Sequence, residues 1–233
     1  ADAAAEPSFD GTITVFAAAA LTDAFTEAAG AFEADNPDVT IELNFAASSS
    51  LREQILAGAP ADVFASANIS NMDRVVEAGE ADGEGEVFAR NSLEIAVPAG
   101  NPGGVEGLAD FADADLLIGL CAVEVPCGEF GRVALANAGV TAAPDTEEPD
   151  VRSLLTKVQA GELDAGIVYR TDVQAAGDTV EGIEIAADDN VVADYPVAAL
   201  SGSGAPDTAT AFVDFLLSDD GQEILESYGF APA

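Results

Sequence analysis

Four short segments place small or helix-starting residues where a helix is expected to begin. They are Ala20-Leu21-Thr22, Ser48-Ser49-Ser50, Pro126-Cys127-Gly128 and Asp150-Val151. The first turn of a helix has up to four backbone N–H groups without an acceptor in the helix, together with about half a positive charge. Such a helix start binds an oxyanion without lysine or arginine. Each start alone is typical of an ordinary capped helix, so only the set of four predicts an anion site.

Tyr169 is a fifth candidate for the same chemistry. It follows the apolar run Gly166-Ile167-Val168, which predicts a buried strand. Ligands bind at the carboxyl edge of the sheet in open α/β folds, so the tyrosine hydroxyl could add a donor there. The alternative is a core tyrosine whose hydroxyl is satisfied by its own neighbours.

Cys121 and Cys127 are the only cysteines of the chain, six positions apart across a loop that contains a proline. They could form a local disulfide in an oxidising compartment, or they could be two free core thiols. We favour the disulfide because the chain has the features of an exported protein. Two cysteines without any histidine supply too few ligands for a metal site, so no metal or cofactor is expected.

Composition excludes several classes of function. The 233 residues include 43 Asp+Glu, 7 Lys+Arg and no His, for a net charge of −36. This charge repels nucleic acid and anionic membranes, because such binding needs cations to displace counterions. Without histidine the usual general base is missing, and no hydrolase or P-loop motif occurs, so we do not expect an enzyme. The self-repulsion of so acidic a fold is screened at about 1 M salt, which indicates adaptation to high salt.

Strand and helix patterns alternate along the chain, which predicts an α/β fold with a mostly parallel sheet covered on both faces. Strands are expected at residues 12–18, 39–45, 61–65, 92–97, 116–120, 165–169, 183–185 and 191–200. Helices are expected at residues 21–34, from Ser48 up to Gly58, and at 71–78, 128–138, 151–160, 207–217 and 222–228. No apolar run reaches the roughly 18 residues of a membrane span. Residues 1–10 read as a flexible leader that could tether an anchored exported protein.

Seven segments, in order, resemble the molybdate-binding proteins of ABC importers. They are ITVFAAAALTDAF (13–25), NFAASSSLREQILAGAPADVFASA (44–67), NSLEIAV (91–97), EVPCGEFG (124–131), PDVRSLLTKVQAGELDAGIVYRTD (149–172), YPVA (195–198) and YGF (228–230). The resemblance covers the chain from about residue 12 to residue 231. The VPCG motif with an upstream cysteine is similar to the actinobacterial branch, in which the two cysteines pair.

The resemblance implies a type II periplasmic binding protein fold, with two α/β lobes joined by two crossing strands and the ligand in the cleft. The first lobe would comprise residues 11–88 plus 198–233, and the second lobe residues 89–197. Hinges would lie near Arg90-Asn91 and Asp194-Tyr195.

The resemblance also implies five ligand-binding positions: Ala20, Ser48, Cys127, Val151 and Tyr169. Cys127 and Val151 would act through backbone N–H groups. Ser48 would act through its N–H and hydroxyl, and Tyr169 through its hydroxyl.

Ala20 departs from the family, whose pattern has serine at this position. The missing hydroxyl should cost about 1.5 to 3 kcal/mol of binding to a charged oxyanion. We expect Thr22, Ser49 or an ordered water to compensate, or the affinity to be lower.

The function implied by the resemblance is capture of molybdate, and also of tungstate, for delivery to the membrane permease of an ABC importer. The protein would be a monomer exported to the periplasm or the cell exterior, and it could carry a lipid anchor. The alternative is a binding protein for another tetrahedral oxyanion such as sulfate.

Overall fold

The computed structural model describes residues 9–233. Most of the predicted leader, residues 1–8, therefore lies outside the described residues. Its last two residues contact the folded chain. The Phe9 ring lies 6.4 Å from the Phe32 ring, and the Asp10 carbonyl accepts a hydrogen bond from Thr208 Oγ1 at 2.9 Å. None of the helices in residues 9–233 is long and apolar enough to cross a membrane.

A nine-stranded sheet runs through the described residues, in the order β2-β1-β3-β9-β4-β7-β5-β6, with β8 paired to β4. The strands are β1 (Gly11–Ala18), β2 (Val39–Ala46), β3 (Val63–Ala65), β4 (Glu86–Pro98), β5 (Ile118–Cys121), β6 (Thr146–Glu148), β7 (Ala165–Tyr169), β8 (Val180–Glu184) and β9 (Val192–Ala199). The apolar runs of β5 and β7 are buried along their whole length, as expected of strands covered on both faces.

The prediction of a mostly parallel sheet is wrong for the molecule as a whole. β1 pairs in parallel with β2 and β3, and β5 pairs in parallel with β6 and β7. The pairs β3–β9, β4–β7, β4–β8 and β4–β9 are all antiparallel. The antiparallel pairs arise because β4 and β9 run between two separate parallel units, a topology that strand periodicity alone does not report.

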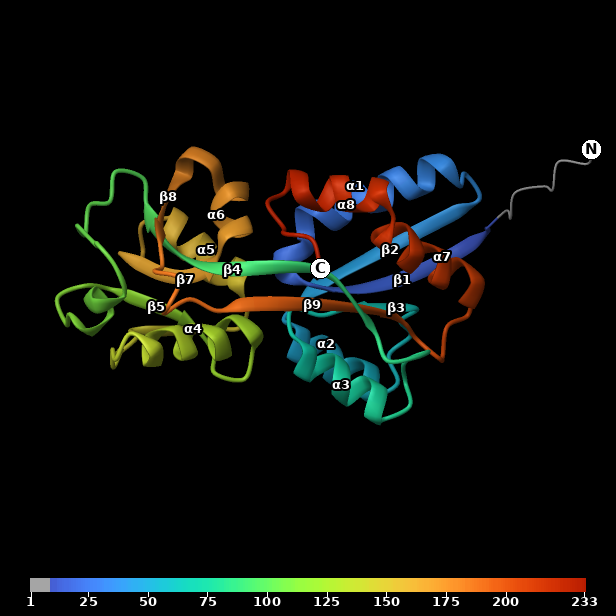
Figure 1. The fold of residues 1–233 in the computed structure, drawn as a ribbon, viewed down its shortest axis with the longest axis horizontal. Helices are drawn as coiled ribbons and strands as arrows, with labels where there is room; N and C mark the ends of the chain where they lie inside the picture. Colours follow the sequence, from blue (N-terminus) through green and yellow to red (C-terminus); the bar gives the residue numbers. More distant parts are fainter. Residues whose placement is uncertain (1–8) are drawn as a thin grey trace, which may run out of the picture.

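Two lobes are visible in Figure 1, and β4 and β9 cross between them side by side. One lobe is built on β1, β2 and β3 and is called the first lobe below. The second lobe is built on β5, β6, β7 and β8. Along the crossing, Arg90 of β4 lies opposite Asp194 of β9, and Arg90 Nε donates to Asp194 Oδ1 at 2.8 Å. Ala231, close to the carboxyl end of the chain, forms a bridge with Arg90.

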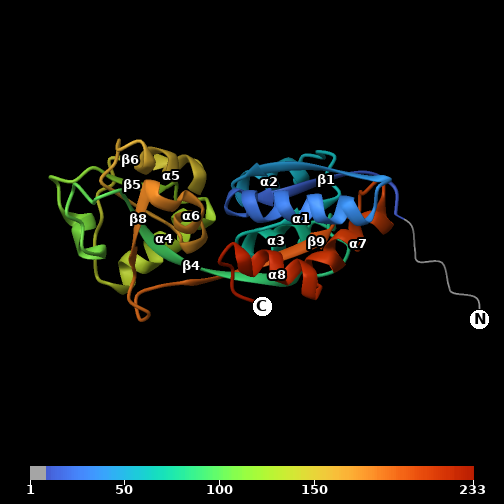
Figure 2. The same cartoon turned by 90° about the horizontal axis from the view of Figure 1, so that it is seen from above.

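Helices cover both faces of the sheet in each lobe (Figures 1 and 2). In the first lobe α1 (Thr22–Asp35), α7 (Pro206–Leu217) and α8 (Asp219–Ser227) lie on one side, and α2 (Ser48–Leu56) and α3 (Ile69–Glu77) on the other. In the second lobe α5 (Val151–Gln159) and α6 (Arg170–Ala176) lie opposite α4 (Pro126–Asn137). Short 3-10 helices are η1 (Ala19–Leu21), η2 (Leu108–Ala112) and η3 (Gly177–Thr179).

The sequence patterns locate most elements to within a few residues. They miss β6, whose three polar residues Thr146-Glu147-Glu148 look like a loop, and α6, whose seven residues are too short for helical periodicity. They also shorten β4, which begins six residues earlier than expected because its first half pairs with β9. Only long-range pairing extends this segment into a strand.

Candidate functional site

The start of α2 places Ser48 in the interior of the protein. Ser48 is buried, and its Oγ accepts a hydrogen bond from the Ala67 N–H at 2.9 Å. This contact uses a lone pair of the hydroxyl and leaves its proton available to donate. The residue before the helix, Ala47, provides no side-chain cap, so the first-turn N–H groups are not used by capping.

The start formed by η1 and α1 places Ala20 in the interior as well. Neither Ala18 nor Leu21, the residues that precede the two helices, provides a side-chain cap. Thr22 does not replace the hydroxyl missing at Ala20, because its Oγ1 donates to the Ala19 carbonyl at 2.7 Å. The expectation that Thr22 compensates is therefore wrong, since the single proton of its hydroxyl is already used. Ser49 is buried and stays a candidate for this role.

The start of α4 is held by the predicted disulfide. Cys121 and Cys127 are bonded, with Cα atoms 5.7 Å apart. Gly128 follows at a position where a Cβ atom would lie 1.8 Å from the Ala122 carbonyl oxygen, so the helix start and the preceding loop are in direct contact. Arg132 Nη1 donates to the carbonyls of Cys121 at 2.8 Å and of Gly128 at 3.0 Å. The Cys127 backbone is thus braced both covalently and by an arginine.

The start of α5 combines a cap with free donors. The Asp150 side chain accepts from the Ser153 N–H at 2.8 Å and from Ser153 Oγ at 3.0 Å. The cap orients the first turn but does not reach the N–H of Val151, which has no acceptor within its own helix. Val151 itself is buried.

Tyr169 ends β7 and is fully buried next to Tyr195 of β9, with the two ring centroids 5.9 Å apart and nearly perpendicular. Neither hydroxyl has a hydrogen-bond partner among residues 9–233. Burial raises the pKa of both hydroxyls above the usual value of 10, so both stay protonated. A buried hydroxyl without a partner is costly in an ordinary core, which argues against the alternative of a satisfied core tyrosine.

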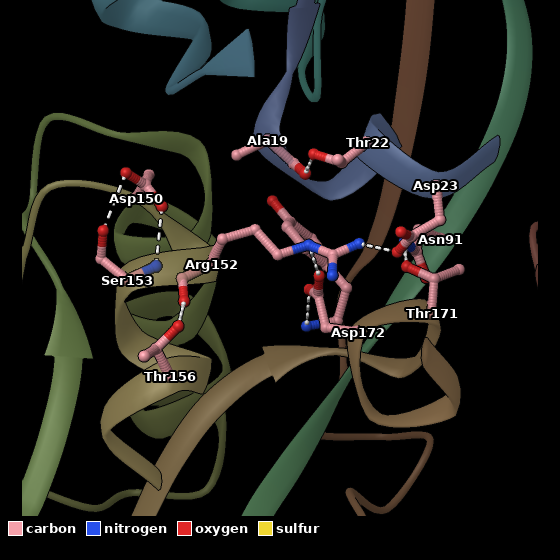
Figure 3. Close-up of polar contacts among 11 residues, drawn as sticks. Ala19, Thr22, Asp23, Asn91, Asp150, Arg152, Ser153, Thr156, Thr171 and Asp172 are labelled. Atoms are coloured by element: carbon pink, nitrogen blue, oxygen red, sulfur yellow. Dashed lines mark hydrogen bonds and ion pairs between the residues drawn. The ribbon is translucent and has the colours of Figure 1, made fainter. Parts of the chain in front are cut away.

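A network of three charged residues lies beside these donors (Figure 3). Arg152, the second residue of α5, contacts Asp23 of α1 through Nη2, and its Nε lies 3.3 Å from Asp172 Oδ1. Asp172 Oδ2 accepts a hydrogen bond from the Tyr169 N–H at 3.1 Å. Burial raises the pKa of Asp172 to about 6, although the Arg152 guanidinium and the Tyr169 N–H lower it.

Elements that carry the predicted positions contact one another across the two lobes. The starts of α2 and α4 face each other across a groove whose lining includes Ser49, Ser50, Ala122 and Val125. Helix α5 packs against η1, which contains Ala20. Tyr169 is joined to the start of α5 through Asp172 and Arg152. These contacts link elements of the two lobes: α2 with the loop before α4, α5 with η1, and Tyr169 with the start of α5.

Three residues of this region were missed by sequence reasoning: Arg152, Asp172 and Tyr195. Arg152 and Asp172 lie in segments whose motifs drew attention to their neighbours, and a single charged side chain gives no periodic signal. Tyr195 was placed near a hinge but not near the other tyrosine, because the contact joins two strands 26 positions apart. A signal was present, since only three tyrosines occur in the chain and two of them are in these strands.

A family model for the bacterial extracellular solute-binding proteins matches residues 13–231. The chain belongs to this family. The solute-binding protein is 38% identical over 220 residues to the protein of Mycobacterium tuberculosis named molybdate-binding protein ModA, which covers 94% of this chain and 84% of the relative. The resemblance seen in the sequence is confirmed, and the relatives are binding proteins rather than enzymes.

Solved structures show the same fold. The periplasmic molybdate-binding protein of Azotobacter vinelandii is similar to this solute-binding protein with a TM-score of 0.83 and 18% identity, covering 95% of this chain and 99% of that chain. The sulfate-binding protein SubI of Mycobacterium tuberculosis gives a TM-score of 0.86 and 19% identity, covering 95% and 87%. At these identities the likeness concerns the fold alone, and it confirms the type II periplasmic binding protein fold.

Proposed function

We propose that this solute-binding protein captures molybdate, and also tungstate, between its lobes and delivers it to the membrane permease of an ABC importer. The observations that support the proposal are the packing of α5 against η1, the groove between the start of α2 and the loop before α4, and the unpartnered hydroxyl of Tyr169. The name of the relative from Mycobacterium tuberculosis supports molybdate as the ligand. The predicted contacts are made by Ala20, Ser48, Cys127, Val151 and Tyr169.

The donors around the site favour a fully deprotonated dianion. Backbone N–H groups and protonated hydroxyls donate, while the carboxylates of Asp23 and Asp172 face Arg152 and that of Asp150 caps the first turn of α5. Phosphate carries a proton near neutral pH and would need an acceptor that this arrangement does not offer. Molybdate and tungstate need none.

Size separates molybdate from sulfate, the alternative ligand. Bonds from molybdenum to oxygen are longer than those from sulfur, so a rigid set of donors placed for molybdate leaves the hydrogen bonds to sulfate stretched. The disulfide and Arg132 at the start of α4 support such rigidity. The sulfate-binding protein with the same fold makes sulfate the alternative to test first.

Closure of the lobes completes the proposal. The predicted lobes, residues 11–88 plus 198–233 and residues 89–197, would rotate about the crossing near Arg90 and Asp194 and exclude water from the anion. Hydrogen bonds to the anion are stronger in such a site because the local dielectric falls. The protein would act as an exported monomer, and its closed form would bind the permease.

Thermal unfolding with four anions tests the function. At about 1 M NaCl, which screens the net charge of −36, molybdate, tungstate, sulfate and phosphate are added separately. A ligand at 100 times its Kd raises the free energy of unfolding by about 2.7 kcal/mol. We expect the melting temperature to rise with molybdate and tungstate only. A rise with sulfate alone would establish the alternative, and no rise with any of the four would overturn the proposal.

Tyrosine variants locate the site in the same assay. Tyr169→Phe removes the unpartnered hydroxyl and should reduce the shift caused by molybdate. Tyr228→Phe is the matched control, because the Tyr228 hydroxyl bonds Glu27 at 2.7 Å on the outside of the first lobe. Equal shifts in the two variants would place the anion elsewhere.

A further inference from the structure

Arg152 occupies a position that helix stability does not explain. It is in the first turn of α5, directly after Val151. A cation in the first turn of a helix opposes the helix dipole and is unfavourable. The chain has only 7 Lys+Arg, so one of its few cations lies where it does not stabilise the helix. Its presence there needs another explanation. Its carboxylate partners provide one.

The two partners come from different lobes (Figure 3). Asp23 is in the first turn of α1, in the first lobe, and its Oδ2 contacts Arg152 Nη2. Asp172 is in α6, in the second lobe, and its Oδ1 lies 3.3 Å from Arg152 Nε. The planar guanidinium can bind two carboxylates at once, which the point charge of a lysine cannot do in the same geometry.

Each partner is linked to a predicted anion contact. Asp172 is fully buried, and its Oδ2 accepts a hydrogen bond from the Tyr169 N–H. It therefore positions the backbone of Tyr169 at the end of β7. Asp23 lies three residues after Ala20 in the sequence, in the helix α1 that follows the short helix η1. The backbone of Arg152 itself follows Val151. One side chain therefore connects donors that belong to both lobes.

We propose that Arg152 is a positioning residue for the anion, which holds the donors of the two lobes in register by binding Asp23 and Asp172 together. This inference rests on the proposed function. The ion pair with Asp172 lies within the second lobe and persists when the lobes separate. The contact with Asp23 crosses between the lobes, so it stabilises the closed form only and slows release of the anion.

Asp23→Asn tests the proposal because two effects have opposite signs. Removal of a negative charge near the site weakens the repulsion of an anion and by itself tightens binding. Loss of the contact across the lobes accelerates release. Because both side chains are partly exposed, we expect molybdate to dissociate about two- to fivefold faster from Asp23→Asn than from the native protein. Stopped-flow tyrosine fluorescence at low salt measures this rate.

Glu27→Gln is the matched control. Glu27 is one turn later on α1, and its Oε2 accepts a hydrogen bond from the Tyr228 hydroxyl of the same lobe. The variant removes the same charge without touching the contact between lobes, so dissociation should be unchanged or slower. Arg152→Lys keeps the positive charge but lacks the planar guanidinium that binds two carboxylates. We expect it to release molybdate faster than the native protein.

The outcomes separate the two proposals. If the native protein binds none of the four anions, the proposed function fails before the role of Arg152 is tested. If it binds molybdate but Asp23→Asn releases the anion at the native rate or more slowly, the positioning role is overturned. Native release from Arg152→Lys would overturn it too, because a single point charge would then be sufficient.

Discussion

The two lobes hold their halves of the candidate site in different ways. In the first lobe, Ala20 lies in a three-residue 3-10 helix without a side-chain cap, and Ser48 is held by one hydrogen bond from Ala67. In the second lobe, a disulfide and Arg132 fix Cys127, and the Asp150 cap orients the first turn that begins with Val151. The second lobe therefore presents donors held by a disulfide, an arginine and a helix cap, whereas the first lobe has no side-chain cap at either helix start and one hydrogen bond at Ser48.

The difference bears on the one departure from the family pattern. Ala20, which lacks the hydroxyl of the family serine, is in the lobe with fewer braces. A loosely held half can adjust its backbone donors to the anion, while a rigid half defines the size of anion that fits. Substitutions in the second lobe should therefore mainly lower the free energy of unfolding. Substitutions at Ala20 should mainly change the Kd for the anion.

The largest effect is expected from Gly128→Ala in the second lobe. The new Cβ would lie 1.8 Å from the Ala122 carbonyl oxygen, so the helix start must move away from the disulfide loop. We expect a loss of about 3 kcal/mol or more in the free energy of unfolding, measured by urea denaturation. Gly131→Ala in the same helix is the control, because its Cβ would meet Ile167 at an ordinary 3.5 Å. Equal midpoints for the two variants would contradict the tight contact at Gly128.

Removal of the disulfide comes next. The double variant Cys121→Ala/Cys127→Ala should lose about 2 kcal/mol of stability, because the closed loop is short. Its affinity for molybdate should fall as well, since the start of α4 is no longer fixed. Calorimetric titration and thermal unfolding, with and without reductant, measure both quantities, and reductant should affect only the native protein. A double variant with native affinity would show that the cystine does not brace the site.

The pH dependence of stability tests the buried carboxylate of the second lobe. The pKa of Asp172 is about 6 in the folded protein and 3.8 in its reference state, so between these values the folded protein holds a proton that the unfolded chain has lost. Asp172 therefore stabilises the fold as the pH falls through 6, and this contribution is lost as the pH rises again. From pH 7 to pH 4.5 the native protein should gain up to about 2 kcal/mol relative to Asp172→Asn.

The measurement is the difference in melting temperature between the native protein and Asp172→Asn across this pH range. Taking the difference cancels the titration of the many surface carboxylates. Asp188→Asn, which removes an exposed carboxylate, is the control for the loss of one negative charge. A flat difference for Asp172→Asn would contradict the raised pKa.

The smallest effect is expected in the first lobe, from Ala20→Ser. The variant restores the hydroxyl of the family pattern, and a hydrogen bond to a charged oxyanion contributes at least about 1.5 kcal/mol, or about tenfold in Kd. Thr22 does not already supply this donor, because its hydroxyl is used by Ala19. Calorimetric titration with molybdate should show tighter binding without a change in the stability of the anion-free protein. An unchanged Kd would mean that Ser49 or a bound water supplies the donor.

Much of the fold was predictable because local patterns and the family motifs agree. The apolar runs of β1, β5 and β7 and the helical spacing of α1 are strong local signals. The short β6 and α6 gave no such signal, and the first half of β4 becomes a strand only because β9 lies beside it. The predicted lobe boundaries and anion contacts stay predictions that the variants above can test.

The sequence by itself determined the α/β class, the absence of histidine chemistry, the family and the five candidate positions. The first two follow from residue types and spacing, which act over one helix or strand, whereas the family and the five positions follow from the resemblance of seven segments to known binding proteins. Only the tertiary structure decided that Thr22 is already bonded, that the rings of Tyr169 and Tyr195 pack together in the interior, and that Arg152 joins carboxylates of two lobes. These contacts join residues up to 129 positions apart, and no local pattern records which side chains the crossing of β4 and β9 brings together.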